Sequence, residues 1–179
     1  MRIIAGKFKK TILYSVPGKT TRPTTDYLRE VIFSVIYNCT DKRVLDLFAG
    51  SGALGLEALS RGAECSIFVE FSNKSINTIR KNINKLNLKN NTRIFKKRVS
   101  SYLNNCEKKF DLIFIDPPYD KDLVNPTLFS IIKNQILTEN GKIIIEHSKN
   151  EIISNNLKFS IEYNKKSGNS IITILKPAY

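Results

Sequence analysis

From residue 42 onward, short apolar runs alternate with segments whose apolar side chains recur every three or four positions. The apolar runs predict strands over residues 44–48, 66–70, 94–95, 110–115, 142–146, 158–163 and 170–175. The segments of helical spacing predict helices over residues 53–60, 73–86, 99–105 and 125–134, the last with Pro126 at its first position. Continuous apolar strands that alternate with helices are typical of a parallel sheet with helices on both faces, so the pattern predicts an α/β fold.

The end of the chain departs from this alternation. A turn is predicted at residues 139–141, directly before the strand over 142–146. The last two strands then come in succession and are joined by the short link 165–168. Strands joined this closely are expected to pair antiparallel. The sequence therefore predicts a mostly parallel seven-stranded sheet with an antiparallel pair at its edge.

The beginning of the chain differs as well. Residues 1–21 are basic and β-prone, contain a turn at Pro17-Gly18, and predict a short hairpin arm that precedes a domain over residues 22–179. A first helix is expected to start at Thr24-Thr25-Asp26, because threonine caps helices and an acid in the first turn suits the helix dipole. Arg29 and Glu30 fall outside the apolar face of this helix, so they are expected either on an exposed helical face or beside a ligand.

Composition narrows the kind of protein. An apolar content of 41% over 179 residues suits one globular domain with a core, and no apolar run approaches the roughly 18 residues of a membrane span. Three scattered cysteines without a Cys-x-x-Cys pair argue for a reducing compartment and against disulfides and zinc. The single histidine, His147, is expected at a strand end rather than on a metal.

The chain is strongly basic, with a formal net charge of +13. Cationic side chains that neutralise phosphates release counterions, so a charge of this size favours a nucleic acid as partner. Solubility alone is the alternative explanation. A membrane surface suits the chain less well, because no segment predicts a helix that is basic on one face and strongly apolar on the other.

A glycine-rich segment joins the strand at 44–48 to the helix at 53–60. It reads Leu45 to Gly55 and ends in Gly-x-Gly-x-x-Gly, and Glu70 lies 20 residues past Gly50 at the end of the next strand. An acid at that position binds ribose hydroxyls in doubly wound nucleotide folds, so the segment predicts an adenosine cofactor rather than a turn kept for packing alone. Asp46 precedes the glycines and would repel a pyrophosphate. An ammonium and a sulfonium without a phosphate, as in S-adenosylmethionine, suit it better.

A second motif, Asp116-Pro117-Pro118-Tyr119, follows the apolar run at 110–115. Proline fixes φ and donates no hydrogen bond, so the two prolines hold an extended backbone with free carbonyls. A carboxylate, a rigid carbonyl and an aromatic ring at one strand end suit a planar group that bears an NH2, such as the exocyclic amine of a nucleobase. A turn before a helix is the simpler alternative. A dehydrogenase would explain the glycine segment but not this motif.

With both motifs, the chain resembles the S-adenosylmethionine-dependent methyltransferases of the Rossmann-like class. More narrowly, it resembles the ribosomal small-subunit RNA methyltransferase D family, which methylates N2 of a guanine in 16S rRNA. The narrower resemblance rests on Arg2-Ile-Ile-Ala-Gly-Lys7, Arg22-Pro-Thr-Thr-Asp26 and Arg29-Glu30. It implies a cytoplasmic monomer that uses S-adenosyl-L-methionine, without a metal or a membrane, on 16S rRNA within the small ribosomal subunit or its assembly intermediate.

The resemblance also implies roles for matching positions. The cofactor is expected at Asp46, Phe48, Ala49, Gly50, Ser51, Gly52, Glu70 and Val99. Val99 enters because Arg98 stands where many relatives carry an acid or an amide near the adenine. Catalysis is expected at Asp116, Pro117, Pro118 and Tyr119, with the first two accepting hydrogen bonds from the guanine amine and Tyr119 stacking on the base. Substrate contacts are expected from Arg2, Lys7, Arg22, Thr24, Asp26 and Arg29.

Other activities remain compatible with these residues. A DNA adenine-N6 methyltransferase uses the same acidic motif, although the chain has no insert large enough for sequence readout. A protein-glutamine methyltransferase usually has asparagine where Asp116 stands. An RNA-binding module without catalysis and a nicotinamide dehydrogenase would each differ from a methyltransferase in failing to bind S-adenosylmethionine.

Overall fold

Seven strands of the described chain form one sheet: β1 (Arg43–Leu47), β2 (Cys65–Glu70), β3 (Thr92–Lys96), β4 (Phe110–Ile115), β5 (Leu137–Ser148), β6 (Phe159–Ser167) and β7 (Ser170–Pro177). The computed structural model describes residues 1–18, 26–154 and 157–178. The strand order is β3-β2-β1-β4-β5-β7-β6, and the first five strands in this order run parallel. β7 lies antiparallel between β5 and β6. The predicted α/β fold with a mostly parallel seven-stranded sheet is confirmed.

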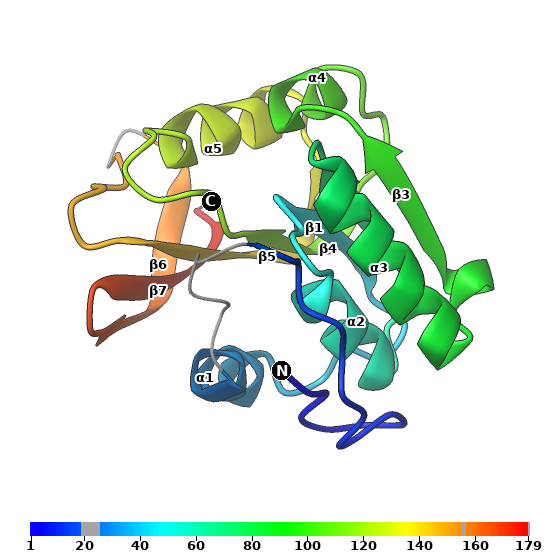
Figure 1. Ribbon diagram of the computed structural model, residues 1–179. Helices are drawn as coiled ribbons and strands as arrows, with labels where there is room; N and C mark the ends of the chain where they lie inside the picture. The colour runs from blue at the N-terminus through cyan, green and yellow to red at the C-terminus, as the bar shows by residue number, and fades with distance from the viewer. Residues whose placement is uncertain (19–25, 155–156, 179) are drawn as a thin grey trace.

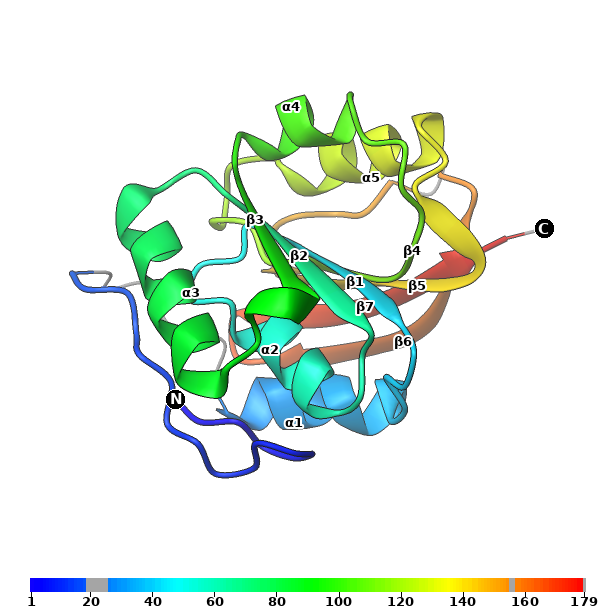
Figure 2. The ribbon, with the colours of Figure 1, turned by 90° about the vertical axis from the view of Figure 1, so that its right-hand side faces the viewer.

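Helices cover both faces of this sheet (Figures 1 and 2). They are α1 (Asp26–Ile36), α2 (Ala53–Ser60), α3 (Asn73–Leu86), α4 (Val99–Leu103) and α5 (Val124–Lys133), with a short 3-10 turn, η1 (Lys89–Asn91). One core cluster joins the sheet to α1, α2 and α3, and a second joins it to α5 and α4. The predicted helices at 53–60 and 73–86 are confirmed, whereas the predicted threonine cap of α1 lies outside the described residues.

Strand alternation decides which side chains reach which layer, and β1 illustrates this. Val44 packs into the cluster of α1, α2 and α3, whereas Leu45 and Leu47 pack into that of α4 and α5. Asp46 lies on the same face of β1 as Val44, so its carboxylate faces α2. The backbone N–H of Gly55 donates to it there at 3.0 Å. A buried acid at the carboxyl end of a central strand is thereby fixed against the start of a helix.

Gly55, the third glycine of the motif, lets α2 approach β2 closely. A Cβ at this position would lie 2.5 Å from both the Phe68 ring and the Ser66 hydroxyl. Because both neighbours belong to the buried strand β2, they have little room to move. The glycine therefore sets the distance between the helix and the sheet, and with it the position of the loop that precedes the helix.

The N-terminal segment, residues 1–18, packs against α2 and α3 as a loop with one isolated antiparallel bridge, Arg2↔Ile12. Ile3 and Leu13 are buried in the core, and the backbone N–H groups of Ile4 and Ala5 donate to the Glu57 carboxylate at 2.7 and 3.0 Å. The predicted hairpin is therefore reduced to this one antiparallel bridge, and no pair of strands forms in residues 1–18. The predicted division between an arm and a domain falls at residues 21 and 22, outside the described residues.

The predicted turn at 139–141 is wrong, because these residues lie inside β5. Phe110 pairs with Leu137 but Leu112 pairs with Lys142, so β5 bulges out of register between them. Gly141 sits in this bulge, and a Cβ there would lie 2.6 Å from the Leu137 side chain. The glycine that suggested a turn instead permits an irregular strand.

Two other boundaries shift. The predicted link at 165–168 is mostly strand, since β6 continues to Ser167 and Gly168 turns with a φ of 60°. The final strands do form the predicted antiparallel pair, with β6 outermost. α5 begins at Val124 rather than 125, so Pro126 is its third residue, where a missing N–H costs nothing.

The remaining compositional expectations concern cysteine, histidine and membrane spans. Cys39, Cys65 and Cys106 are free thiols. His147 lies in β5 next to its last residue, with Nε2 3.0 Å from the Thr173 hydroxyl. Among the residues with described positions, no three side chains are grouped to hold a metal ion. No described helix has the length and apolarity to cross a membrane.

Candidate active site

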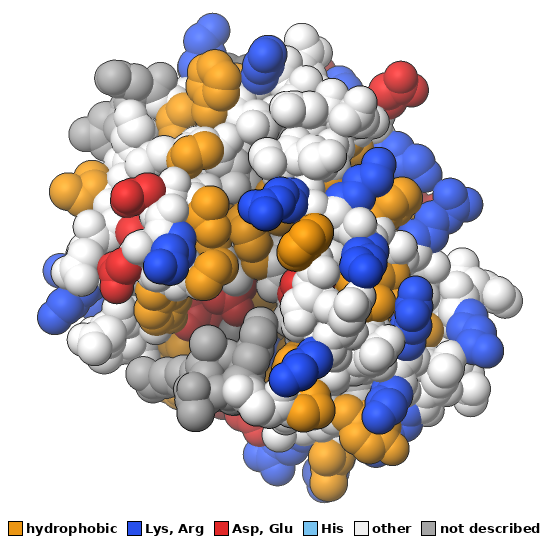
Figure 3. Space-filling model, turned by 45° about the horizontal axis from the view of Figure 1, so that its top comes forward, with side chains coloured by type: hydrophobic (Ala, Val, Ile, Leu, Met, Phe, Trp, Pro, Cys, Tyr) orange, Lys and Arg blue, Asp and Glu red, His pale blue; other side chains and the backbone are white. Residues whose placement is uncertain are grey.

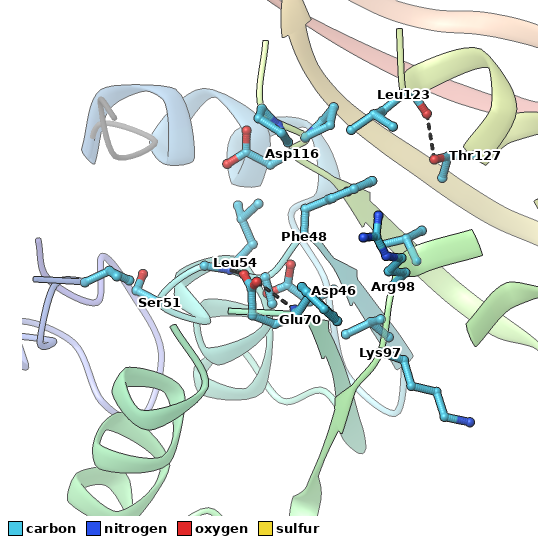
Figure 4. Close-up of a pocket in the computed structure, with 18 of the residues that line it drawn as sticks. Asp46, Phe48, Ser51, Leu54, Glu70, Lys97, Arg98, Asp116, Leu123 and Thr127 are labelled. Atoms are coloured by element: carbon cyan, nitrogen blue, oxygen red, sulfur yellow. Dashed lines mark hydrogen bonds between the residues drawn. The ribbon is translucent and has the colours of Figure 1, made fainter. Parts of the chain in front are cut away.

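The carboxyl ends of β1, β2 and β4 open into one cavity of about 790 Å³. β1 pairs with β2 on one side and with β4 on the other, so the loops that follow these strands meet at one edge of the sheet. The glycine segment and the Asp-Pro-Pro-Tyr motif, about 65 residues apart in sequence, therefore share this cavity. Figure 4 shows Asp116 on one side of the cavity and Asp46 with Glu70 on the other.

Most of the residues predicted for the site line this cavity. From the predicted cofactor set they are Asp46, Phe48, Ala49, Gly50, Ser51, Glu70 and Val99, and from the predicted catalytic set Asp116, Pro117, Pro118 and Tyr119. Gly52 does not line it. This residue is buried at the N-cap of α2 with a φ of 79°, and its N–H donates to the Ala49 carbonyl at 2.7 Å. Its contribution is to the turn that shapes the loop.

Asp46 lies at the bottom of the cavity and is 1% exposed. Burial raises the pKa of Asp46 well above its ordinary value, the hydrogen bond from Gly55 opposes this shift, and the carboxylates of Asp116 and Glu70 add to it. The charges of Asp116 and Glu70 thus reach the Asp46 carboxyl, and the three acids create a negative region in the cavity. A cation placed among them would stabilise the ionised forms.

Glu70 is held by backbone groups on both of its oxygens. The N–H of Gly50 donates to Oε2 at 2.9 Å, and those of Phe71 and Ser72 donate to Oε1 at 2.7 and 2.8 Å. Hydrogen bonds to both oxygens fix the direction of the carboxylate. The acid at the end of β2 is therefore tied directly to the glycine loop at the end of β1.

The loop itself has an unusual backbone. Phe48, Gly50 and Gly52 all have positive φ, of 59°, 56° and 79°. For glycine this conformation is unstrained, but for phenylalanine it is rare and costs energy. Backbone strain of this kind persists where the surroundings enforce it and is concentrated at ligand-binding sites.

Tyr119 forms the side of the cavity nearest β5 and β7. Its hydroxyl donates to Oε1 of Glu146 at 2.8 Å and lies 2.6 Å from the hydroxyl of Ser170. Burial raises the pKa of Tyr119, the hydrogen bond with Ser170 lowers it, and the Glu146 charge raises it again, so the phenol stays protonated. The ring is thus held at a fixed position beside Asp116.

The cavity has further walls that the sequence analysis missed. The N-terminal segment contributes Met1, Ser15 and Val16. The residues after β2 and β3 and the start of α4 contribute Phe71, Lys97 and Ser100. The N-cap and body of α5 contribute Leu123, Pro126, Thr127 and Ser130. Phe71 directly follows Glu70, so adjacency to a predicted strand end was a usable signal. Nothing in the local sequence placed Ser15 or Val16 there. Arg98 also lines the cavity, with its guanidinium 5.2 Å above the Phe71 ring.

Arg29, one of the predicted substrate contacts, does not lie at the surface. Arg29 is fully buried, so the expectation of an exposed helical position is wrong. Its guanidinium lies 2.6 Å from Asp26 and 3.8 Å from the buried Glu57, which it neutralises between α1 and α2. A side chain without exposed surface cannot contact RNA in this conformation, which corrects its assignment as a substrate contact.

The other predicted contacts lie on the surface or outside the description. Arg2 and Asp26 form a partly exposed ion pair at 3.5 Å, away from the cavity. Lys7 is exposed, but its N–H donates to Ser60 at the far end of α2 from the cavity. Arg22 and Thr24 are outside the described residues.

The chain is similar to known proteins over nearly its whole length. A family model described as "Conserved hypothetical protein 95" matches residues 1–176. The chain is 42% identical over 153 residues to "Putative rRNA methyltransferase YlbH" of Bacillus subtilis (strain 168). The aligned region covers 83% of this chain and 83% of that protein. It is 33% identical over 147 residues to "Ribosomal RNA small subunit methyltransferase D" of Escherichia coli (strain K12), with 82% of this chain and 74% of that protein covered.

A solved structure gives the same picture. "Putative methyltransferase yhhF from Escherichia coli" superposes with a TM-score of 0.88 at 31% sequence identity, over 99% of this chain and 98% of that chain. The region matched by the family model includes both motifs that line the cavity. The likeness therefore extends to the cavity as well as to the sheet and its helices.

Proposed function

The chain belongs to the ribosomal RNA small subunit methyltransferase D family, and from this premise we propose that it transfers a methyl group from S-adenosylmethionine to the exocyclic N2 of a guanine in 16S rRNA. By family and fold it is a methyltransferase. The observation that carries the finer proposal is the single cavity in which a glycine loop with two acids faces an Asp-Pro-Pro-Tyr motif. One cavity of this size accommodates a cofactor and the edge of a base together.

The residues at the cavity floor fit this cofactor. Asp46, Glu70 and Asp116 form a negative region in which a sulfonium and an ammonium are stabilised, whereas a pyrophosphate would be repelled. Asp46 and the backbone of Phe48 to Ser51 would hold the methionine end, and Glu70 would accept from the ribose hydroxyls. Val99 and the exposed Phe71 would flank the adenine, because Phe71 directly follows Glu70 and Val99 follows β3, whose last residue pairs with Glu70.

The protein's own groups would act on the amine of the base. When bound, the cofactor supplies a methyl group that is already activated by a positive sulfur. Asp116 and the Pro117 carbonyl would accept hydrogen bonds from the two N–H groups of the amine and direct its lone pair into the cavity. Alignment of this kind contributes many powers of ten to a rate. The Asp116 carboxylate would also stabilise the positive charge that develops on nitrogen.

The base would have to leave its stack to reach this motif. A paired guanine keeps its amine inside the helix, so the target is unpaired or flipped out, and the Tyr119 ring would replace the lost stacking. Figure 3 shows acidic side chains deep in a hollow, hydrophobic side chains beside it, and Lys and Arg side chains farther out on the same face. Cationic side chains on the face that holds the hollow suit a polyanion that presents one base.

The proposal includes the setting of the reaction. We propose a cytoplasmic monomer that acts without a metal on 16S rRNA in the small subunit or its assembly intermediate. The relatives named as rRNA methyltransferases support the rRNA substrate.

The test is methyl transfer from labelled S-adenosylmethionine onto small subunits that lack the modification, followed by mapping of the labelled nucleotide. Label on the N2 of one guanine is the expected result. Label on an adenine or on a protein would show that the enzyme methylates a substrate other than the proposed guanine. Absence of cofactor binding in calorimetry would contradict the proposed methyl transfer and favour an RNA-binding module without catalysis.

A further inference from the structure

Glu146 is a buried carboxylate at the edge of the site that neither motif contains. It lies near the end of β5, one residue past Ile145, whose register partner on β4 is Ile115. Asp116 stands one residue past Ile115, so the two acids follow paired residues on neighbouring strands. Both of their charges act on the Tyr119 hydroxyl. Glu146 is therefore next to the proposed base site without being part of the predicted one.

The contact between Glu146 and Tyr119 has a defined direction. A phenol carries one proton, which Tyr119 donates to Oε1 of Glu146 at 2.8 Å, so Ser170 must supply the proton of the second hydrogen bond at 2.6 Å. Glu146 belongs to β5 and Ser170 begins β7, two neighbouring strands of the sheet. Two bonds from rigid elements thus fix one atom at the tip of the ring.

This arrangement serves packing poorly. Glu146 is 5% exposed, and its Oε2 has no hydrogen-bond partner among the residues that the structure describes. A buried carboxylate oxygen without a partner costs stability, and an apolar residue of similar size would avoid that cost. A group that a fold retains in this state calls for a functional explanation.

The ring itself needs an anchor. Tyr119 sits in the connection between β4 and α5, where the following residues Asp120 and Asp122 have positive φ of 55° and 52°. A ring in such a connection has no helix or strand to set its direction. Anchoring its hydroxyl to the sheet would present the ring at one angle and lower the entropy lost when a base stacks on it.

We propose that Glu146 is a positioning residue that, together with Ser170, holds the Tyr119 ring as the surface on which the target base stacks. This inference rests on the proposed function. Glu146 acts through the hydroxyl of Tyr119 and does not itself line the cavity.

The test is a double-mutant cycle with methyl transfer onto small subunits as the assay. Glu146→Leu should lower kcat about tenfold, the effect of about one lost hydrogen bond, with cofactor affinity in calorimetry unchanged. Tyr119→Phe removes the bonds to both Glu146 and Ser170, so it should lower kcat at least as much. The double variant should be no slower than Tyr119→Phe, because Tyr119→Phe already removes the bond that Glu146→Leu removes. Glu146→Gln keeps an acceptor for the phenol and should restore most of the rate.

Glu151→Leu is the matched control, because Glu151 is also buried with one unpartnered oxygen but lies outside the cavity. It should keep the wild-type kcat. Additive losses in the cycle, wild-type rates in both single variants, or failure of Glu146→Gln to restore the rate would each overturn the inference. If Glu146→Leu does not fold, Glu146→Met, which also removes the acceptor, takes its place in the cycle with Tyr119→Phe. A wild-type protein that transfers no label would instead count against the proposed function.

Discussion

Asp46 determines the electrostatics of the cavity at the residue scale. Its position on β1 buries it, and its neighbours in the cavity are two further acids. A fold that needed only a cap for α2 could use a neutral residue here, since the contact is a single hydrogen bond from Gly55. The acid is better explained by a cationic ligand, which would offset the cost of burying its charge.

Asp46→Asn should make the melting temperature of the ligand-free protein less dependent on pH. Because burial raises the pKa of Asp46, the folded protein keeps a proton that the unfolded chain releases above a pH of about 3.9. The wild type therefore loses stability as pH rises from that value through the raised pKa of the folded state, and the asparagine variant does not. Scanning calorimetry between about pH 4 and pH 7 should find the variant's advantage growing with pH.

Asp41→Asn gives a control for this experiment, because Asp41 is exposed at the opposite end of β1. Its melting temperature should follow that of the wild type at each pH. Parallel curves for Asp46→Asn and the wild type would contradict the argument. Asp46→Asn should also bind S-adenosylmethionine more weakly, since the cationic cofactor loses the negative charge of Asp46.

Asp116→Asn separates chemistry from cofactor binding. The amide removes the charge that would stabilise the developing cation, so kcat should fall by about 100-fold or more while cofactor affinity in calorimetry persists. Asp111→Asn is the matched control, because Asp111 lies near the start of β4, at the end opposite to Asp116, in an ion pair with Arg43. Equal kcat values for the two variants would remove Asp116 from the mechanism.

At the scale of elements, α3 joins the N-terminal segment to the glycine loop through one side chain. Asn82 is fully buried. Its amide oxygen accepts from the N–H of Tyr14 at 2.7 Å, and its amide nitrogen donates to the carbonyls of Tyr14 and Ser51 at 3.1 and 3.0 Å. Ser15 and Val16, which follow directly, line the cavity. The N-terminal segment is thus part of the cavity wall.

Asn82→Leu should loosen this wall. The variant removes all three hydrogen bonds and leaves Tyr14 and Ser51 backbone groups without them, so residues 1–18 should exchange amide hydrogens faster and cofactor affinity should fall. Thr78→Val on the same helix is the control, because the Thr78 hydroxyl donates only within α3, to Lys74. Unchanged exchange and affinity in Asn82→Leu would show that the segment needs no such link.

At the scale of the whole molecule, charge is distributed unevenly. The chain carries a net charge of +13, yet three acids, Asp46, Glu70 and Asp116, line the cavity. Lys74 at the start of α3 and Lys96 at the end of β3 lie at the carboxyl edge of the sheet, on the side of the cavity. Lys108 and Lys109 precede β4 at the opposite edge. All four lysines are exposed, so reversing either pair changes the net charge by the same amount at a different place on the surface.

Reversing Lys74 and Lys96 to glutamate should weaken binding to small-subunit rRNA and flatten its dependence on salt by roughly one unit of slope per lost phosphate contact. Lys108→Glu with Lys109→Glu should leave the slope near that of the wild type. Binding titrations over a salt series provide the measurement. Equal effects from both pairs would indicate that net charge alone, rather than a surface around the cavity, attracts the RNA.

The sequence by itself determined the order of strands and helices, the parallel sheet and the two cavity motifs. Apolar periodicity reports burial within a few residues, and strands that alternate with helices leave few topologies in which all of them are buried. The carboxyl ends of adjacent parallel strands then meet at one edge, which brings Asp46 and Asp116 together without further information.

Only the tertiary structure decided which side chains meet across long stretches of chain. The burial of Arg29 depends on Glu57, the cavity wall at Ser15 depends on Asn82, and the orientation of Tyr119 depends on Glu146 and Ser170. The bulge at Gly141 likewise depends on its pairing with β4. Each of these contacts joins residues more than 25 positions apart. A local pattern carries no record of such a partner, because the partner is chosen when the layers pack.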